Sequence, residues 1–231
     1  MGATMVGVVA ALAAEARALG PVKRIGDVGC LADGTLVAVS GMGCAAAGLA
    51  AARLIEAGAS ALMSFGLAGG LDPSLGAGSV VLPREVISLN GARCLTSTAW
   101  REQLRTAIAR QRPVADGILL SSLDVIDAVA DKAAAFRDTG AVAVDMESIG
   151  VAQVAAAHGL PFVAVRVIVD TAADVLPRAV VAASRAGQVS LRRLVGGLAV
   201  APFELVALIR LAQRYRAATR SLAAVAGARV A

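Results

Sequence analysis

The sequence predicts an α/β fold of three layers, in which helices cover both faces of a central mixed, twisted sheet and the C-terminus extends as further helices. Short runs rich in valine, leucine and isoleucine alternate with longer alanine-rich runs, as strands and helices do in such folds. Several of the short runs are apolar throughout, which is expected of strands covered on both faces. The 231 residues, 58% of them hydrophobic, suffice for one sizeable domain.

The apolar runs place the strands, and the alanine-rich runs place the helices. The first apolar run, at residues 5–11, has no basic segment before it and is therefore expected to be a buried strand, not a signal peptide. Further strands are expected at residues 35–40, 61–65, 79–82, 117–120, 141–144 and 162–169. Helices are expected between them, at residues 13–19, 45–57, 99–111, 129–138 and 148–157.

Charge is distributed unevenly between the body of the chain and its C-terminal end. The net charge is +5, but residues 178–231 contain nine arginines and one acidic residue, so residues 1–177 are mildly acidic. Aromatic residues make up only 3% of the chain. A nucleic-acid binder needs positive charge and stacking side chains, so we expect no nucleic-acid partner. We expect one domain at residues 1–177 and basic amphipathic helices at residues 178–231, packed on that domain or extending from it.

The basic end of the chain has a helical periodicity. Apolar residues share one helical face, and arginines lie on the other: Leu205, Leu208, Leu211, Ala212, Tyr215, Ala218 and Leu222 against Arg210, Arg214, Arg216 and Arg220. Such a helix suits an anionic membrane surface, which predicts a cytoplasmic protein held at the inner face of the cytoplasmic membrane. A helix docked on the domain or on a partner subunit, with its arginines in solvent, explains the pattern equally well.

The residues with chemical potential follow the expected strands. Ligands of open α/β sheets bind at the carboxyl ends of strands, so residues at these ends are site candidates. They are Ser40 to Gly43, Gly66 to Gly70, Asp145 to Glu147, and Asp170. Turns need glycine in any case, so the carboxylates are the stronger signal. One histidine and three scattered cysteines show no ligand spacing, so no metal is expected.

Five segments together resemble a known family. VGVVAALAAEARAL, SGMG, FGLAGGLDPSLGAGSVVLP, VAVDMES and PFVAVRVIVD occur in the order and spacing of the methylthioadenosine/S-adenosylhomocysteine nucleosidases, members of the purine and uridine phosphorylase superfamily. The resemblance implies the nucleoside phosphorylase/hydrolase-like fold and cleavage of the N-glycosidic bond of an adenine nucleoside. It implies that Asp170 is the general acid that protonates the leaving adenine and that Glu15 orients or deprotonates the attacking water. Glu147 would accept hydrogen bonds from the ribose 2′- and 3′-hydroxyls.

The resemblance also implies a set of substrate contacts. These are Met146 against the sugar, the glycine-rich segment along the sugar and nucleophile pocket, and two residues near the purine: Met146, Gly66, Leu67, Ala68, Val125, Ile126, Ser40 and Met42. The family usually has an aromatic residue near the purine, where this chain has Val125 and Ile126.

Each candidate also has a purely structural explanation. Glu15 and Glu147 could be first-turn charges that suit a helix dipole. Asp170 and Ser40 could be helix N-caps, and the two methionines could be ordinary core residues. The three carboxylates occur together at matching positions, which favours the catalytic interpretation.

Three features depart from the nucleosidases. The segment after VLP is short, Leu67 replaces the usual serine, and a basic extension follows the family core. Together they resemble the hopanoid-associated phosphorylases, which implies adenosylhopane as the substrate and hopanoid side-chain biosynthesis as the role. An open 5′ side would admit such a bulky, lipid-linked nucleoside.

The nucleophile is either water or inorganic phosphate, and no other cofactor is implied. Superfamily phosphorylases place arginine where this chain has Glu15 and Ser64. A carboxylate at the first position would repel phosphate, so we expect hydrolysis, although Arg166 and Arg84 could contribute to a phosphate site.

Two other functions are open at this point. One is a methylthioadenosine or S-adenosylhomocysteine nucleosidase, and the other is a non-catalytic, membrane-associated nucleoside-binding protein. Family resemblance also implies a homodimer or a larger closed homo-oligomer.

Overall fold

The computed structural model describes residues 4–109, 112–176 and 204–227, with the side chains of the last segment described from Gln213 onward. The expected helical character of residues 178–203 lies outside the described residues. The strands of the model are β1 (Val6–Ala10), β2 (Lys23–Ile25), β3 (Val28–Cys30), β4 (Leu36–Val39), β5 (Ala61–Gly70), β6 (Val80–Val81), β7 (Glu85–Ser88), β8 (Arg93–Leu95), β9 (Val114–Ala115), β10 (Ile118–Ser121), β11 (Ala141–Asp145) and β12 (Phe162–Asp170). The helices are α1 (Ala13–Ala18), α2 (Cys44–Glu56), α3 (Thr98–Ala109), α4 (Val129–Thr139), α5 (Ser148–Ala157) and α8 (Glu204–Gly227).

The described strands form a single mixed sheet. Its main path runs β2-β3-β4-β1-β5-β11-β10-β7-β8, while β12 pairs with β5 and with β6, which in turn pairs with β9. Strands β4, β1 and β5 are mutually parallel along this path, β12 runs parallel to β5 beside it, and β11 is antiparallel to β5. The long strand β5 therefore has β1, β11 and β12 as neighbours and lies at the centre of the sheet.

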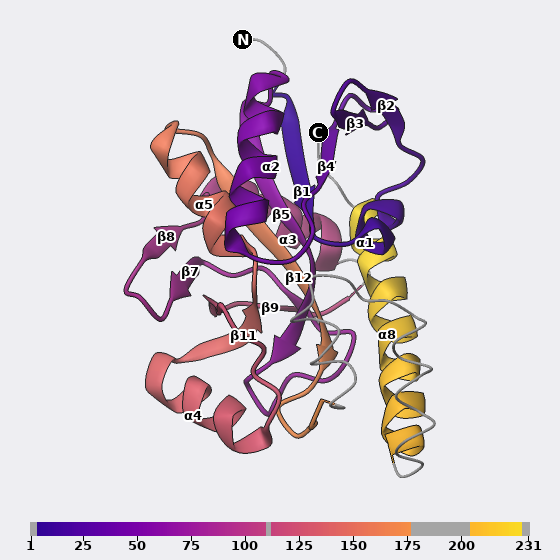
Figure 1. Ribbon diagram of the computed structural model, residues 1–231, viewed down its shortest axis with the longest axis vertical. Coiled ribbons are helices and arrows are strands. Elements are labelled where there is room, and N and C mark those ends of the chain that lie inside the picture. Colours follow the sequence, from indigo (N-terminus) through magenta and orange to yellow (C-terminus); the bar gives the residue numbers. More distant parts are fainter. Residues whose placement is uncertain (1–3, 110–111, 177–203, 228–231) are drawn as a thin grey trace.

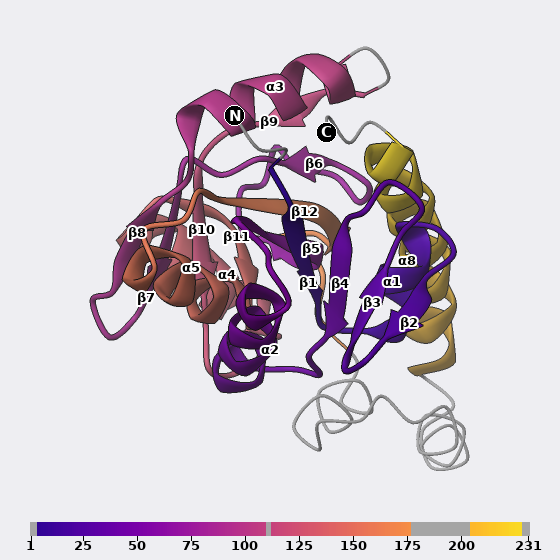
Figure 2. The same cartoon turned by 90° about the horizontal axis from the view of Figure 1, so that it is seen from above.

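Helices cover both faces of the sheet, so the predicted three-layer α/β/α fold is confirmed (Figures 1 and 2). On one face α2 and α5 pack against each other and against the strands, in a core cluster that includes Leu54, Ile149 and Leu62. On the other face α1 and α8 pack together, in a second cluster that includes Ala16, Leu222 and Phe65.

The expected elements are present, with two kinds of difference. The strand expected at residues 61–65 continues through the glycines to Gly70, because β12 and β11 pair with that part of the chain and hold it extended. The sequence did not predict two antiparallel hairpins, β2–β3 and β7–β8, or the two-residue strand β9. Their strands are short and partly exposed, so they lack the apolar runs that marked the others.

The described half of α8 is docked on the domain. Ala218 and Leu222 have no exposed surface, while Arg216 and Arg220 face solvent, as the periodicity predicts. Arg214 forms an ion pair with Asp174, which follows β12. The apolar face of this half is thus covered by protein and is not free to contact a membrane. Within the described residues, no helix combines the length and the apolar character needed to cross a bilayer.

Candidate active site

The sheet brings the predicted carboxylates to one edge. Strands β1, β5 and β12 are parallel, so their carboxyl ends lie together. Helix α1 follows β1 after two residues and contributes Glu15, while Asp170 is the last residue of β12. Strand β11 approaches β5 from the other direction, pairing Val144 with Gly69, and delivers Glu147 just beyond its end.

Glu15 is buried against the glycine-rich end of β5. Its carboxylate accepts hydrogen bonds from the backbone N–H of Leu67, at 2.9 Å, and of Leu12, also at 2.9 Å. A Cβ at Gly66 would lie 2.6 Å from Oε1 of Glu15, so glycine is needed there to admit the carboxylate. Burial raises the pKa of Glu15, although the two amides and Arg166 favour its charged form. Glu15 is therefore a fixed, desolvated carboxylate that also serves the first turn of α1, because Leu12 is the N-cap residue of that helix.

Glu147 lies in the gap between α2 and α5. It is 8% exposed, and its carboxylate accepts hydrogen bonds from the N–H of Gly43 at 3.0 Å and of Met146 at 3.2 Å. Burial raises the pKa of Glu147 to about 7, and the negative charges of Asp145 and Glu15 add to the effect. Glu147 is the N-cap residue of α5, but its side chain makes no capping hydrogen bond to that helix. Its carboxylate therefore does not cap α5 and instead binds the N–H of Gly43, the N-cap residue of α2.

Asp170 is buried beside a lysine that the sequence analysis did not single out. Nζ of Lys132, from α4, lies 2.5 Å from Oδ2 of Asp170 and also donates to the carbonyls of Thr171, at 2.9 Å, and Asp174, at 3.0 Å. Lys132 has no exposed surface. Burial raises the pKa of Asp170, while the lysine opposes that shift. A Cβ at Gly69 would lie 3.3 Å from Oδ2 of Asp170, so this second glycine leaves room for the second carboxylate.

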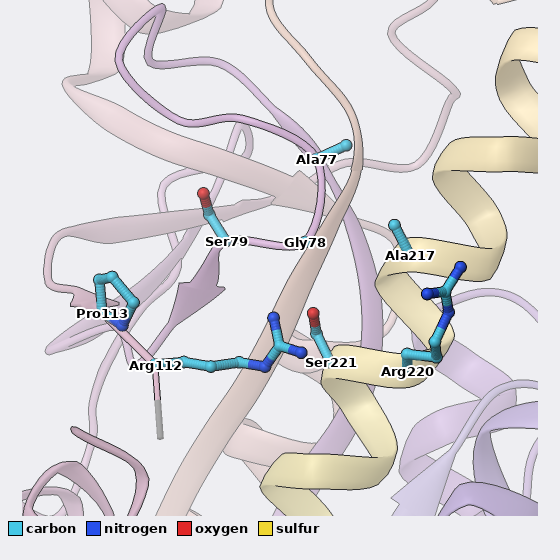
Figure 3. A pocket seen from close by; sticks show the side chains of 8 residues that line it. All are labelled: Ala77, Gly78, Ser79, Arg112, Pro113, Ala217, Arg220 and Ser221. Atoms are coloured by element: carbon cyan, nitrogen blue, oxygen red, sulfur yellow. The ribbon is translucent and has the colours of Figure 1, made fainter. Parts of the chain in front are cut away.

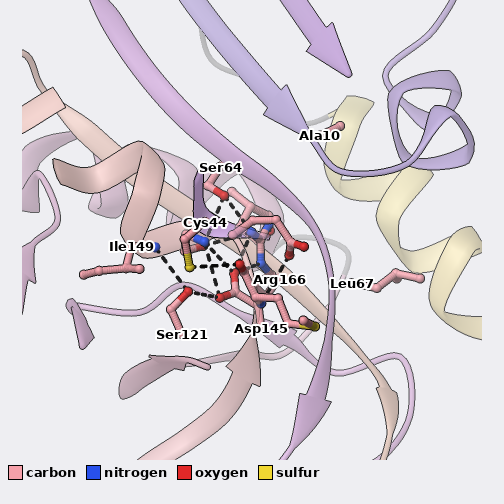
Figure 4. A network of polar contacts seen from close by, with 12 residues as sticks. Ala10, Cys44, Ser64, Leu67, Ser121, Asp145, Ile149 and Arg166 are labelled. Atoms are coloured by element: carbon pink, nitrogen blue, oxygen red, sulfur yellow. Dashed lines mark hydrogen bonds and ion pairs between the residues drawn. The ribbon is translucent and has the colours of Figure 1, made fainter. Parts of the chain in front are cut away.

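A buried polar network joins the strands beneath these carboxylates (Figure 4). Arg166 of β12 donates from Nε to Asp145 at 2.7 Å, and from Nη2 to the hydroxyls of Ser64 at 2.6 Å and Ser148 at 2.8 Å. Asp145 also accepts a hydrogen bond from the hydroxyl of Ser121 at 2.6 Å. The guanidinium and the Ser64 hydroxyl are thus committed to the protein, and the arginine lowers the pKa values of Glu15 and Glu147 from where burial alone would set them.

Some of the other predicted substrate contacts lie near the carboxylates. Leu67 holds Glu15 through its backbone, Ala68 is buried in β5, and Met146 is half-buried beside Glu147. The hydroxyl of Ser40 donates to the carbonyl of Gly41 at 2.6 Å, and the N-cap of α2 is Gly43, so the alternative of Ser40 as a cap is wrong.

Three further candidates make no contact that assigns them a role. Met42 is half-buried at the start of α2. Val125 and Ile126 are half-buried between β10 and α4, where Ile126 packs on the cluster around Leu120. Their substrate contacts stay predictions. No group of three potential metal ligands occurs among the described residues.

Comparison with known proteins shows to which family this chain belongs. The family model of the phosphorylase superfamily matches residues 1–196. The chain belongs to the phosphorylase superfamily. It is thus an enzyme of the nucleoside phosphorylase and nucleosidase class. No curated protein matches the chain.

Three solved structures illustrate which proteins share the fold of this chain. A Helicobacter pylori MTAN mutant with 5′-methylthioadenosine in its active site has 20% identity and a TM-score of 0.66, over 74% of this chain and 87% of the other. Campylobacter jejuni 5′-methylthioadenosine/S-adenosyl homocysteine nucleosidase has 19% identity and a TM-score of 0.68, over 75% and 89%. Helicobacter pylori futalosine hydrolase has 20% identity and a TM-score of 0.68, over 83% and 95%. At these identities the likeness establishes the fold.

The sequence signal for Lys132, and for the contact between Arg166 and Asp145, was weak. Lys132 stands in an alanine-rich helical run, where a lysine is normally a solvated surface residue. Arg166 was visible as a charge inside the apolar run of residues 162–169, and such a residue requires a partner when buried. Asp145 preceded Met146 in the quoted motif, but its link to Arg166 depends on strand pairing across the sheet.

Proposed function

We propose that this enzyme releases adenine from an adenine nucleoside by cleaving the N-glycosidic bond. The observation that supports this most directly is the trio of buried carboxylates, Glu15, Glu147 and Asp170, around the carboxyl end of β5. Structure alone rarely buries three carboxylates at one edge, because each costs free energy unless it has a task or a partner. General-acid and general-base chemistry at a glycosidic carbon needs groups of this kind.

In this mechanism Asp170 donates a proton to the imidazole ring of the departing purine. Its raised pKa favours the protonated form that a general acid needs. The ammonium of Lys132, 2.5 Å from Oδ2, then stabilises the carboxylate that remains after the proton has left. Adenine leaves as a neutral molecule, which requires far less driving force than departure of an anion.

On the sugar side, Glu147 accepts hydrogen bonds from the vicinal 2′- and 3′-hydroxyls. Glu15 orients and deprotonates the attacking water at the anomeric carbon. Hydrolysis is supported over phosphorolysis because the carboxylate of Glu15 would repel phosphate and because Ser64 and Arg166 are bonded to each other. Arg84 is exposed after β6.

The substrate we propose is adenosylhopane, whose 5′ substituent is a large apolar lipid. The segment after β6 is reduced to the β7–β8 hairpin. Parallel pairing aligns Ser88 of β7 and Asp145 of β11 with Ser121, so the hairpin turn begins at the same edge as the site. Leu89 in that turn is 70% exposed and Leu123, after β10, is 80% exposed. This apolar rim fits a lipid substituent better than the small thioether of methylthioadenosine.

Adenine release from adenosylhopane, followed by chromatography with and without phosphate, tests the proposal. We expect release without phosphate, and we expect none from Asp170→Asn, whose amide cannot supply the proton. A strict need for phosphate would show that Glu15 does not activate water. If methylthioadenosine is cleaved and adenosylhopane is not, the enzyme is a salvage nucleosidase and the proposed lipid substrate is wrong. Binding without turnover in both wild type and variant would identify a non-catalytic nucleoside-binding protein.

We propose further that the enzyme works in the cytoplasm at the inner membrane face, as a homodimer or larger homo-oligomer. The exposed arginines of α8 support the first part, since its apolar face is already covered. A vesicle co-sedimentation assay with Arg216→Gln as the variant checks it, and equal sedimentation of both proteins would contradict it. The family resemblance supports the second part, and light scattering of the purified protein gives the number of subunits.

A further inference from the structure

A pocket lies between α8 and the sheet, and none of the three carboxylates lines it. It has a volume of about 340 Å³, within the range of small-molecule sites. Its walls come from three separate parts of the chain: the segment before β6, the segment before β9, and the last turns of α8 (Figure 3). Their lining residues are Ala77, Gly78, Ser79, Arg112, Pro113, Ala217, Arg220 and Ser221.

The pocket is positively charged. Arg112 reaches from the segment before β9 toward α8, and Arg220 stands on α8 next to Ser221 (Figure 3). None of the described residues that line the pocket is acidic. Among the ion pairs of the described residues, neither Arg112 nor Arg220 takes part in one, whereas Arg214, six residues earlier on the helix, is paired with Asp174. Two guanidinium groups without a carboxylate partner favour an anion between them.

A buried hydroxyl adds a directed hydrogen-bonding group. Ser221 is only 1% exposed and lines the pocket. Its hydroxyl makes no hydrogen bond to the residues that the structure describes, and it is not among the fully buried polar atoms there that lack a partner, so it keeps contact with the space of the pocket. A buried hydroxyl normally has such a partner, so one that opens into a charged pocket is available to a ligand.

The floor of the pocket is fixed by the sheet. Gly78 donates its N–H to the carbonyl of Ile168 at 2.7 Å, and Ser79 accepts a hydrogen bond from the N–H of Ile168 at 2.9 Å. Gly78 has a φ of +89°, and a Cβ there would lie 3.2 Å from the hydroxyl of Ser221. Glycine therefore keeps the space in front of this hydroxyl open.

We propose that this pocket binds a phosphate-type oxyanion, held by Arg112 and Arg220 and by the hydroxyl of Ser221. The planar guanidinium offers paired N–H donors that match two phosphate oxygens, and the hydroxyl supplies a third donor. The ligand is either a soluble phosphate or the headgroup of an anionic phospholipid, because both present the same oxygens. This site is separate from the carboxylates and does not depend on the reaction proposed for them.

Calorimetric titration of the full-length protein with inorganic phosphate, and co-sedimentation with phosphatidylglycerol vesicles, test the proposal. The variant is Arg112→Gln/Arg220→Gln, and the matched control is Arg24→Gln/Arg53→Gln, which removes the same charge from exposed positions. We expect the double variant to lose a phosphate-binding event that the control keeps, and Ser221→Ala to weaken that event about two- to tenfold with no change in charge. Melting temperatures of all variants confirm that each is folded.

The two probes separate the sources of the anion. Vesicle binding that free phosphate displaces, and that only the Arg112/Arg220 variant loses, identifies a lipid headgroup. Phosphate binding without vesicle binding identifies a soluble phosphate. If neither probe binds the wild type, or if the double variant binds both probes as the control does, the pocket is not an anion site.

Discussion

At the scale of single residues, Glu147 links the candidate site to the stability of the fold. Its pKa is about 7 in the folded protein against an ordinary value of 4.5, so the folded state holds the proton more tightly than the unfolded chain does. The free energy of unfolding must therefore fall as pH rises from 4.5 to about 7, by an amount of about 3 kcal/mol for the full shift. Glu147→Gln has no such proton to lose.

We expect the melting temperature of Glu147→Gln, relative to wild type, to rise between pH 5 and pH 8. The amide of the variant can place an N–H donor, where wild type has an acceptor, near the N–H of Met146. This lowers the stability of the variant by the same amount at both pH values, so the difference between pH 5 and pH 8 does not contain it. Parallel melting profiles for the two proteins would show that Glu147 titrates normally. Glu56→Gln, at the exposed end of α2, serves as the control for the loss of a carboxylate.

Lys132 offers a second residue-scale prediction, which depends on the proposed role of Asp170. Its ammonium favours the carboxylate form, so Lys132→Met should raise the pKa of Asp170 further. A general acid acts while protonated, so activity is lost as pH rises through its pKa. The basic limb of kcat/KM should therefore move upward by about one pH unit or more. An unmoved limb with a uniformly lower rate would mean that the lysine only shapes the loop after β12; Lys23→Met, on the exposed strand β2, is the control.

Residue roles were predictable from the sequence where a motif marks them, and not otherwise. Glu147 and Asp170 were expected at strand ends and Glu15 in the helix after the first strand, each within a segment that carries the family resemblance, and the fold brings all three to β5. Lys132 and the Arg166–Asp145 pair depend on which helix and strands meet. That is a property of the tertiary fold, and no local pattern records it.

At the scale of elements, two glycines make contrasting predictions about how α2 and α5 pack. A Cβ at Gly150 would lie 2.0 Å from the carbonyl oxygen of Cys44, while a Cβ at Gly48 would find its nearest atom at 3.5 Å. Gly150→Ala should therefore force the helices apart and cost about 1–3 kcal/mol of stability. Gly48→Ala should be neutral or stabilise by up to about 1 kcal/mol, because alanine is the better helix former. Chemical denaturation of both variants measures the difference, and equal stabilities would disprove close packing of these helices.

The two hairpins that the sequence analysis did not predict have turn sequences that indicate them. Asn90-Gly91 lies in the turn of the β7–β8 hairpin, and Gly26-Asp27 joins β2 to β3. Both dipeptides are typical of tight hairpin turns. Exposed strands of three or four residues give no apolar run, so only the turn chemistry could have revealed them. Helix α5 was predicted to the residue, since its boundaries are an acidic motif and a glycine.

At the scale of the whole molecule, α8 closes the second face of the sheet. Its buried residues share a cluster with Phe65, Val165 and Val167 of β5 and β12, the strands that end at the candidate site. The periodicity of the tail predicted this apolar face but could not tell a membrane from the protein's own sheet, because both present an apolar surface. Contact with β12 settles the described half in favour of the sheet.

Leu222→Ala tests whether this helix is part of the cooperative fold. Leu222 has no exposed surface, so the substitution should leave a cavity and cost about 2–5 kcal/mol. Because the helix packs on the strands that position Asp170, the entire domain should unfold in one transition at a lower temperature. Arg216→Ala, on the exposed face, should change stability by less than about 0.5 kcal/mol. Calorimetry gives both values; a separate low-temperature transition in Leu222→Ala, with the main one unmoved, would mean that α8 is an appendage that can leave the domain, and its apolar face would then be free for a membrane.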